Sequence, residues 1–173
     1  MANIKINRIT NANIYIDGNS FLGRAEEINL PQIKHALAEH KALGMVGKAE
    51  FFSGIDKLEC KIKWASLYSE VMKKAANPFK SVQLQARASL ETYTGQGRTA
   101  EGPVAVYLTG VFKDFPLGNF KQHDNAEFET NLTVYYAKME IDGQVIFEID
   151  VLENIYKVDG LDVLAQYRTN IGG

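Results

Sequence analysis

Apolar and polar residues alternate with a period of two through the middle and the C-terminal part of the chain. This period is typical of strands that bury one face and expose the other to solvent. The alternation therefore predicts four long antiparallel strands, each with one buried face. Their apolar rows are Leu58, Cys60, Ile62 and Trp64; Val82, Leu84, Ala86, Ala88 and Leu90; Val104, Val106, Leu108 and Phe112, interrupted by Gly110; and Phe128, Leu132, Val134 and Tyr136.

The polar positions of the same strands form a second set, which we expect to face solvent or a water-filled space. Glu127 and Glu129 could act as paired carboxylates in acid–base catalysis. Neighbouring rows carry lysine, arginine and glutamine, which favours a solvated face instead. The whole polar set is Lys57, Glu59, Lys61 and Lys63; Gln83, Gln85, Arg87, Ser89 and Glu91; Thr109; and Glu127, Glu129, Asn131 and Thr133.

Two Asp-Gly pairs lie between residues that favour strands. Asp17-Gly18 separates residues 13–16 from 20–23, and Asp142-Gly143 separates residues 134–141 from 144–149. Asp-Gly is typical of type I′ hairpin turns, which require positive φ. Both pairs therefore predict β-hairpins.

Two short helices are predicted. Ser66 is placed to cap a helix over residues 67–76, which ends at Asn77-Pro78, and apolar residues recur at helical spacing over residues 161–168. Two helices are too few for repeated βαβ units. The predicted class is mainly β (α+β), an antiparallel β-sandwich or barrel with one or two short helices, which we expect to cover the apolar rows.

Residues 31–48 interrupt the strand pattern. Ala-rich composition favours a helix, whereas Gly44 and Gly47 favour an extended arm, and both alternatives remain open. The segment carries more apolar residues than a solvated loop should. We expect its apolar side chains to pack on a neighbouring subunit or ring rather than on the core of their own chain; these are Ile33, Leu37, Leu43, Met45 and Val46. The sequence contains no linker between domains, so residues 1–173 are predicted to form one domain, with residues 31–48 as an insertion.

Charge and cysteine content exclude several classes of protein. Nineteen basic and 21 acidic residues give a net charge of −2, which excludes a protein that coats nucleic acid through a basic face. The single Cys60 excludes an intrachain disulfide and a multi-cysteine metal site. With no apolar run of about 20 residues and no signal-peptide core, we expect synthesis in the cytoplasm without stable membrane association.

Candidate reactive residues do not form a known catalytic motif. Gly95-Gln96-Gly97 lacks the lysine and the third glycine of phosphate-binding loops, so it is interpreted as a connection between strands. His35 and His40 would point to different sides of a helix, and His123 lies in a polar turn. Trp64 and Cys60 belong to an apolar row and are interpreted as core residues. We therefore expect no enzymatic activity and no cofactor.

Strand length points to self-association. Several predicted strands exceed ten residues, against about five or six in most proteins. Long strands leave unpaired edges on which another chain can add. The sequence therefore favours a protein that assembles through its sheets.

The chain resembles the major tail tube proteins of contractile-tailed phages and R-type pyocins along nearly its whole length. The similarity begins at residues 13–23 and 26–31 and continues at Gly44-Met45 and residues 54–59. Its strongest part is C-terminal, at residues 135–143, 148–150 and 159–168. Ala38-Glu39 and Ala42-Leu43-Gly44 depart from the family pattern in the arm.

The resemblance implies a structural subunit that forms hexameric rings with one continuous β-barrel, and rings that stack into a hollow tube. We expect the polar set of the four long strands to line the lumen of this tube. The implied partners are other copies of the chain, the tail sheath protein, the tape-measure protein, and the baseplate and tail-terminator proteins. Double-stranded DNA would pass through the lumen without specific binding, or the tube would puncture a membrane in a pyocin-like particle. The implied location is a virion tail or tail-like particle assembled in the bacterial cytoplasm. Two alternatives are a secretion-system tube ring protein and a monomeric β-sandwich binding module.

Overall fold

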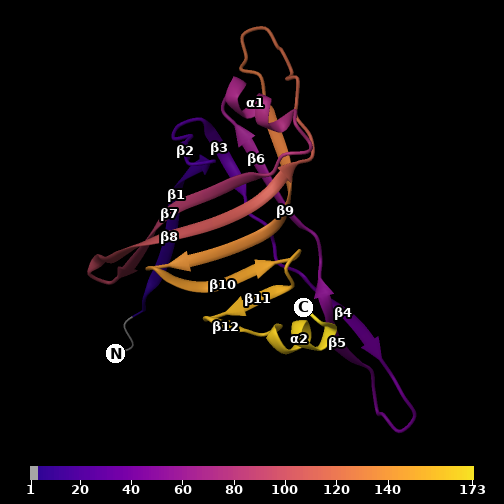
Figure 1. The fold of residues 1–173 in the computed structure, drawn as a ribbon. Helices are drawn as coiled ribbons and strands as arrows, with labels where there is room; N and C mark the ends of the chain where they lie inside the picture. The colour runs from indigo at the N-terminus through magenta and orange to yellow at the C-terminus, as the bar shows by residue number, and fades with distance from the viewer. Residues whose placement is uncertain (1–3) are drawn as a thin grey trace.

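A computed structural model describes residues 4–173 of the chain. In this part of the chain, antiparallel strands predominate and two short helices are present, which confirms the predicted class (Figure 1). The strands and helices in chain order are β1 (Ile6–Ile16), β2 (Asn19–Ser20), β3 (Ala25–Asn29), β4 (His35–His40), β5 (Ala49–Ile55), β6 (Leu58–Trp64), α1 (Ser69–Ala75), β7 (Val82–Thr94), β8 (Gly97–Phe112), β9 (Phe128–Ile141), β10 (Gln144–Asp150), β11 (Ile155–Val158), β12 (Leu161–Asp162) and α2 (Ala165–Ile171).

Strand β9 is the centre of the main sheet. It pairs with β8 along one edge, and with β6 and then β10 along the other edge. The sheet continues from β8 through β7 to β1 and β2, from β6 to β3, and from β10 to β11 and β12. Strands β7, β8 and β9 have 13, 16 and 14 residues, which confirms the unusual strand length expected from the sequence.

Both predicted Asp-Gly hairpins are confirmed. Asp17 and Gly18 have φ values of 49° and 82° between β1 and β2, and Asp142 and Gly143 have values of 51° and 77° between β9 and β10. These positive φ values are the ones that a type I′ turn requires. A third tight turn, through Gly95 and Gln96, joins β7 to β8.

The core contains the apolar rows of β6, β8 and β9, the first three residues of the β7 row, and residues of β1 and β10. The last two residues of the predicted β7 row, Ala88 and Leu90, are half-buried and lie outside the core. One assignment in these rows is wrong, because Tyr136 lies on the polar face. A β-bulge causes the change: Gly110 pairs with Val134 while the preceding Thr109 pairs with Tyr136. A Cβ atom at Gly110 would lie 2.1 Å from the carbonyl oxygen of Thr133, so this close approach of β8 and β9 requires glycine.

The helices differ from their predicted positions and roles. Helix α1 begins at Ser69, with Tyr68 at its N-cap and no side-chain capping bond, so the predicted cap by Ser66 is wrong. It places Val71 and Ala75 in the core. Residues 161–162 form a strand rather than the start of a helix, and α2 buries none of its residues. Strands of the curved sheet therefore enclose most of the core themselves, and only α1 contributes as expected.

Strands β4 and β5 form a separate two-stranded sheet that projects from the body of the molecule (Figure 1). Of the two alternatives for residues 31–48, this conformation is the extended one. The projecting hairpin, residues 35–55, is called the arm below, and its loop, residues 41–48, is called the arm tip. His35 and His40 lie at opposite ends of β4, on a strand rather than on a helix.

Candidate functional site

Strand register brings the predicted polar residues together on one face of the main sheet. Lys61 lies opposite Asn131, and Glu59 lies opposite Thr133, across β6 and β9. Across β7 and β8, Gln83 lies opposite Thr109. Directly opposite residues of antiparallel strands share a face, so these rows form one continuous surface, called the polar face below. Lys57 and Glu127 lie just outside the ends of β6 and β9.

Several residues of the polar face were absent from the sequence prediction. Tyr107 lies opposite both Gln85 and Lys138, and Glu148 lies opposite Lys138 and Lys157. The alternation on β8 that includes Thr109 also includes Tyr107, so the sequence contained this signal. By contrast, the bulge that turns Tyr136 toward this face could be found only from the structure.

Ion pairs cover the half of the polar face formed by β3, β6 and β9. The carboxylate of Glu59 pairs with Lys113 and, at 3.1 Å, with Lys57, and the pKa of Glu59 is therefore lowered. Lys61 Nζ lies 2.9 Å from Glu129 Oε1. Every one of these cations has a carboxylate neighbour, so this half of the face carries both signs of charge in close alternation.

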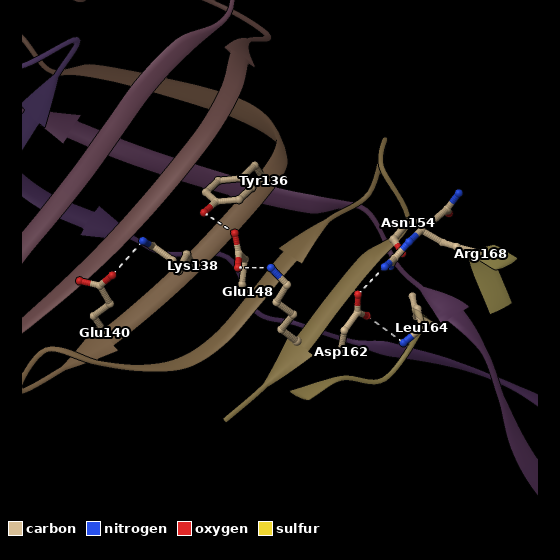
Figure 2. Close-up of polar contacts among 9 residues, drawn as sticks. Tyr136, Lys138, Glu140, Glu148, Asn154, Asp162, Leu164 and Arg168 are labelled. Carbon is tan, nitrogen blue, oxygen red and sulfur yellow. Dashed lines mark hydrogen bonds and ion pairs between the residues drawn. The ribbon is translucent and has the colours of Figure 1, made fainter. Parts of the chain in front are cut away.

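On the opposite half of the polar face, formed by β9, β10 and β11, charged side chains also pair with one another (Figure 2). Tyr136 donates a hydrogen bond to Glu148 Oε1 at 3.0 Å, and Lys157 donates to Glu148 Oε2 at 3.2 Å. Burial, and then the Glu148 carboxylate, raise the pKa of Tyr136 to about 12. Lys138 and Glu140 pair at 2.8 Å. The charged groups here are thus already neutralised by one another.

Arg87, unlike the lysines described above, is held by neutral side chains. Its guanidinium donates to Gln85 Oε1 at 2.9 Å and lies 4.9 Å from the ring centroid of Tyr15. A guanidinium over an aromatic ring is held by cation–π attraction and by hydrogen bonding rather than by a carboxylate. The cation is therefore fixed in place by neutral groups of the same face.

Arg168 fixes α2 to the end of the sheet. Its guanidinium donates to Asp162 Oδ2 at 2.5 Å and to the carbonyl oxygen of Asn154 at 2.9 Å (Figure 2). The backbone N–H of Leu164 donates to the other oxygen of Asp162. The hydrogen bond with Arg168 lowers the pKa of Asp162 and raises that of Arg168. Helix α2 is therefore held by polar contacts rather than by burial.

The arm carries exposed apolar side chains. Leu43 and Val46 at its tip are fully exposed, and Leu37 and Met45 are 54% and 42% exposed. The expected contact of Ile33 with a neighbouring subunit or ring is wrong. Ile33 precedes β4, is half-buried and packs against the core of its own chain. The prediction from sequence missed two further exposed apolar residues of the arm, Phe51 and Phe52, which lie on β5.

The residues considered for chemistry do not come together. Cys60 is buried in the core, and burial raises the pKa of its thiol to about 12. Trp64 is also in the core, as predicted. His35 Nε2 lies 3.0 Å from the hydroxyl of Tyr156, where it links the arm to β11. Within residues 4–173, no three His, Cys, Asp or Glu side chains are grouped to hold a metal ion, and neither helix is long and apolar enough to cross a membrane.

Solved structures with a similar fold come from an extracellular contractile injection system named PVC. Its sheath/tube terminator in the extended state has a TM-score of 0.56 and 10% identity, and covers 75% of this chain and 92% of that chain. Its sheath–tube complex has the same TM-score with 9% identity, covering 75% and 87% of the two chains. At such low identity, these two structures show similarity of fold alone.

Similarity of sequence extends over nearly the whole chain. The tail tube protein of Escherichia phage P2 is 29% identical over 166 residues, covering 92% of this chain and 94% of the relative. The major tail tube protein of Serratia phage KSP20 is 25% identical over 149 residues, covering 85% and 84%. The model of a family described as phage tail tube protein FII matches residues 6–172. The chain therefore belongs to the phage tail tube protein FII family, and it is a structural subunit of a tail tube.

Proposed function

We propose that the polar face lines the channel of the tube. Copies of the chain would form hexameric rings in which their sheets join into one barrel, and the rings would stack. The observation that supports this orientation is a row of polar side chains that crosses five strands of this face, from β7 to β11: Gln85, Tyr107, Lys138, Glu148 and Lys157. A wall of this kind keeps a channel hydrated.

The charge pattern of this face suits a conduit. Among the predicted lumen residues, Lys57, Lys61, Lys63 and Arg87 are balanced by four glutamates. Each phosphate neutralised by a protein cation adds salt-dependent affinity for DNA, which would slow its passage. Lysines that already pair with carboxylates of their own chain have little tendency to bind passing phosphates.

The proposed partners follow from the assembly. The solved relatives are described as parts of sheath–tube and sheath/tube-terminator complexes, which supports a tail sheath and a terminator protein as partners here. A tape-measure protein during assembly, a baseplate at one end and double-stranded DNA passing through are further parts of the proposal. The proposed location is a virion tail or tail-like particle, assembled in the bacterial cytoplasm, and the role is non-catalytic.

Cysteine labelling of assembled tubes tests the orientation of the polar face. Gln85→Cys places a thiol on this face, whereas Ser69→Cys places one on exposed α1, on the core side of the sheet. Both variants would carry Cys60→Ala, and the unchanged chain would measure any reaction of the buried Cys60.

In intact tubes, the thiol at position 85 should react with a small maleimide but be protected from a polymer-linked one. Unassembled protein should react with both reagents. The thiol at position 69 should react with both reagents in intact and in unassembled protein. Rapid reaction of position 85 with the polymer-linked reagent in intact tubes would show that the polar face points outward.

A further inference from the structure

We infer that an apolar pocket beside the base of the arm binds the arm tip of a second copy of this chain. The pocket has a volume of about 440 Å³ and lies between β5, the end of β10, β11 and α2. Its apolar wall includes Phe52, Ile55, Ile149, Ile155, Leu164 and Tyr167. This inference adds an acceptor site to the tube assembly proposed above and depends on that proposal.

Helix α2 supplies an uncovered wall of the pocket. The helix buries none of its residues within the described chain, and Tyr167 and Ile171 are 51% and 56% exposed. A helix of seven residues is not stable by itself, and Arg168 holds this one to the sheet through polar bonds. An apolar helix surface that is fixed in place without being buried is suited to a partner that arrives from outside.

The arm tip carries exposed apolar side chains that could fill this apolar pocket. Leu43 and Val46 are fully exposed on the arm tip, which begins with Lys41 and ends with Lys48. Lys48 Nζ lies 3.0 Å from Glu39 Oε1 of the arm itself, so Lys41 supplies the positive charge of the tip. The base of the arm, where His35 pairs with Ile55, lies near the pocket, whereas His40 pairs with Ala49 next to the tip. The six-residue strand between them separates the tip from its own pocket by about 17–20 Å. The tip can therefore fill only the pocket of another copy.

Charge distinguishes this pocket from the larger cleft beside β3 and β6. That cleft, of about 700 Å³, is lined by four lysines, Lys34, Lys57, Lys61 and Lys113, and by two carboxylates, Asp56 and Glu59. Its remaining excess of positive charge does not favour a tip that begins with Lys41. The apolar pocket contains the carboxylate of Asp150 instead. An apolar centre surrounded by a polar rim is the usual arrangement of a protein interface.

The geometry of such a contact suits a growing assembly. The tip and the pocket are different parts of the surface, so each copy can donate one tip and accept another. Contacts of this head-to-tail kind build rings or open filaments rather than closed dimers. The proposed contact therefore extends an assembly instead of ending it.

Mixed-disulfide formation tests the contact directly. Met45→Cys and Tyr167→Cys would be made as separate proteins, each with Cys60→Ala, and mixed under assembly conditions with mild oxidant. We expect a covalent pair that contains one of each. Replacing the second protein by Leu117→Cys, which exposes a thiol on the loop after β8, is the matched control and should give at least about tenfold less product.

A second experiment introduces a carboxylate into the tip or the pocket and measures the protein concentration needed for assembly. Val46→Asp at the tip and Tyr167→Asp in the pocket should each raise the protein concentration needed for assembly by at least about tenfold, because a carboxylate would be desolvated. Leu117→Asp should not change it, and circular dichroism would show that all three proteins are folded. Tubes that form without the mixed disulfide, or a normal assembly threshold for Val46→Asp, would overturn the inference while leaving the tube function intact. A mixed disulfide in a protein that never forms tubes would contradict the proposed function instead.

Discussion

Trp64 Nε1 donates a hydrogen bond to Thr130 Oγ1 at 3.0 Å, and this bond joins β6 to β9 inside the core. Trp64 is 2% exposed and Thr130 is completely buried. Thr130 thus occupies an apolar row as a polar residue, because its hydroxyl is the acceptor that the buried indole requires.

Replacement of Thr130 by valine should leave the indole N–H buried without an acceptor. Valine has nearly the shape of threonine, so the main cost is desolvation of the donor, about 1–3 kcal/mol of unfolding free energy. Urea unfolding followed by tryptophan fluorescence measures this cost. Thr133→Val, on the polar face of the same strand, should change stability by less than about 0.5 kcal/mol. Equal effects of the two substitutions would show that the hydrogen bond contributes nothing.

Asp17→Asn should lower stability at neutral pH but not in acid. Burial raises the pKa of Asp17, but hydrogen bonds from Lys74 and from the Gln83 N–H outweigh it, and the pKa lies below the ordinary 3.8. The stabilisation is therefore present above pH 3.8 and is lost as the pH falls through the pKa of the folded protein. Asparagine tolerates the positive φ of the turn and still accepts from Gln83.

Urea unfolding at a series of pH values from 7 downward should show a deficit of about 1 kcal/mol for Asp17→Asn that vanishes in acid. Asp142→Asn is the matched control, because Asp142 has the same turn position and no ion pair within residues 4–173. A deficit that is constant with pH would assign the effect to the turn rather than to the charge.

Gly110→Ala should be strongly destabilising. The new Cβ would lie 2.1 Å from the Thr133 carbonyl oxygen, so β8 and β9 must move apart at the bulge. Such overpacking costs about 1–3 kcal/mol or more. Gly95→Ala, at a position with no atom within 4 Å and no positive φ, controls for the change in chain entropy. Comparable thermal unfolding midpoints for the two variants would contradict the role given to Gly110.

Conversion of both Glu127 and Glu129 to lysine should impede DNA passage while tubes still form. Each substitution replaces a carboxylate by a cation, and Lys61 loses its partner at 2.9 Å. Retention of DNA by such tubes should weaken steeply with salt. The double Glu→Gln variant removes the carboxylates without adding cations and should retain much less DNA. DNA release from particles at low and high salt measures the difference, and unimpeded release with the lysines at low salt would refute the lumen assignment.

Local sequence determined much of the sheet. Rows such as Leu58, Cys60, Ile62 and Trp64 were identified correctly, because a period of two places alternate side chains on opposite faces whatever the partner strand is. The two Asp-Gly turns were likewise identified, since few residues adopt the positive φ that these turns need. The polar residues of β6, β7 and β9 followed from the same alternation.

Contacts between distant strands decided the rest. Tyr136 turned to the polar face because β8 and β9 meet at a bulge around Gly110, and Ile33 packed on its own core although it precedes the exposed arm. The arm is extended because β4 and β5 pair with each other, against the helical preference of its alanines. Alternation along one strand is a local property of the chain, whereas bulges, strand partners and the covering of a helix such as α2 depend on residues far away in sequence, so only the tertiary structure decided them.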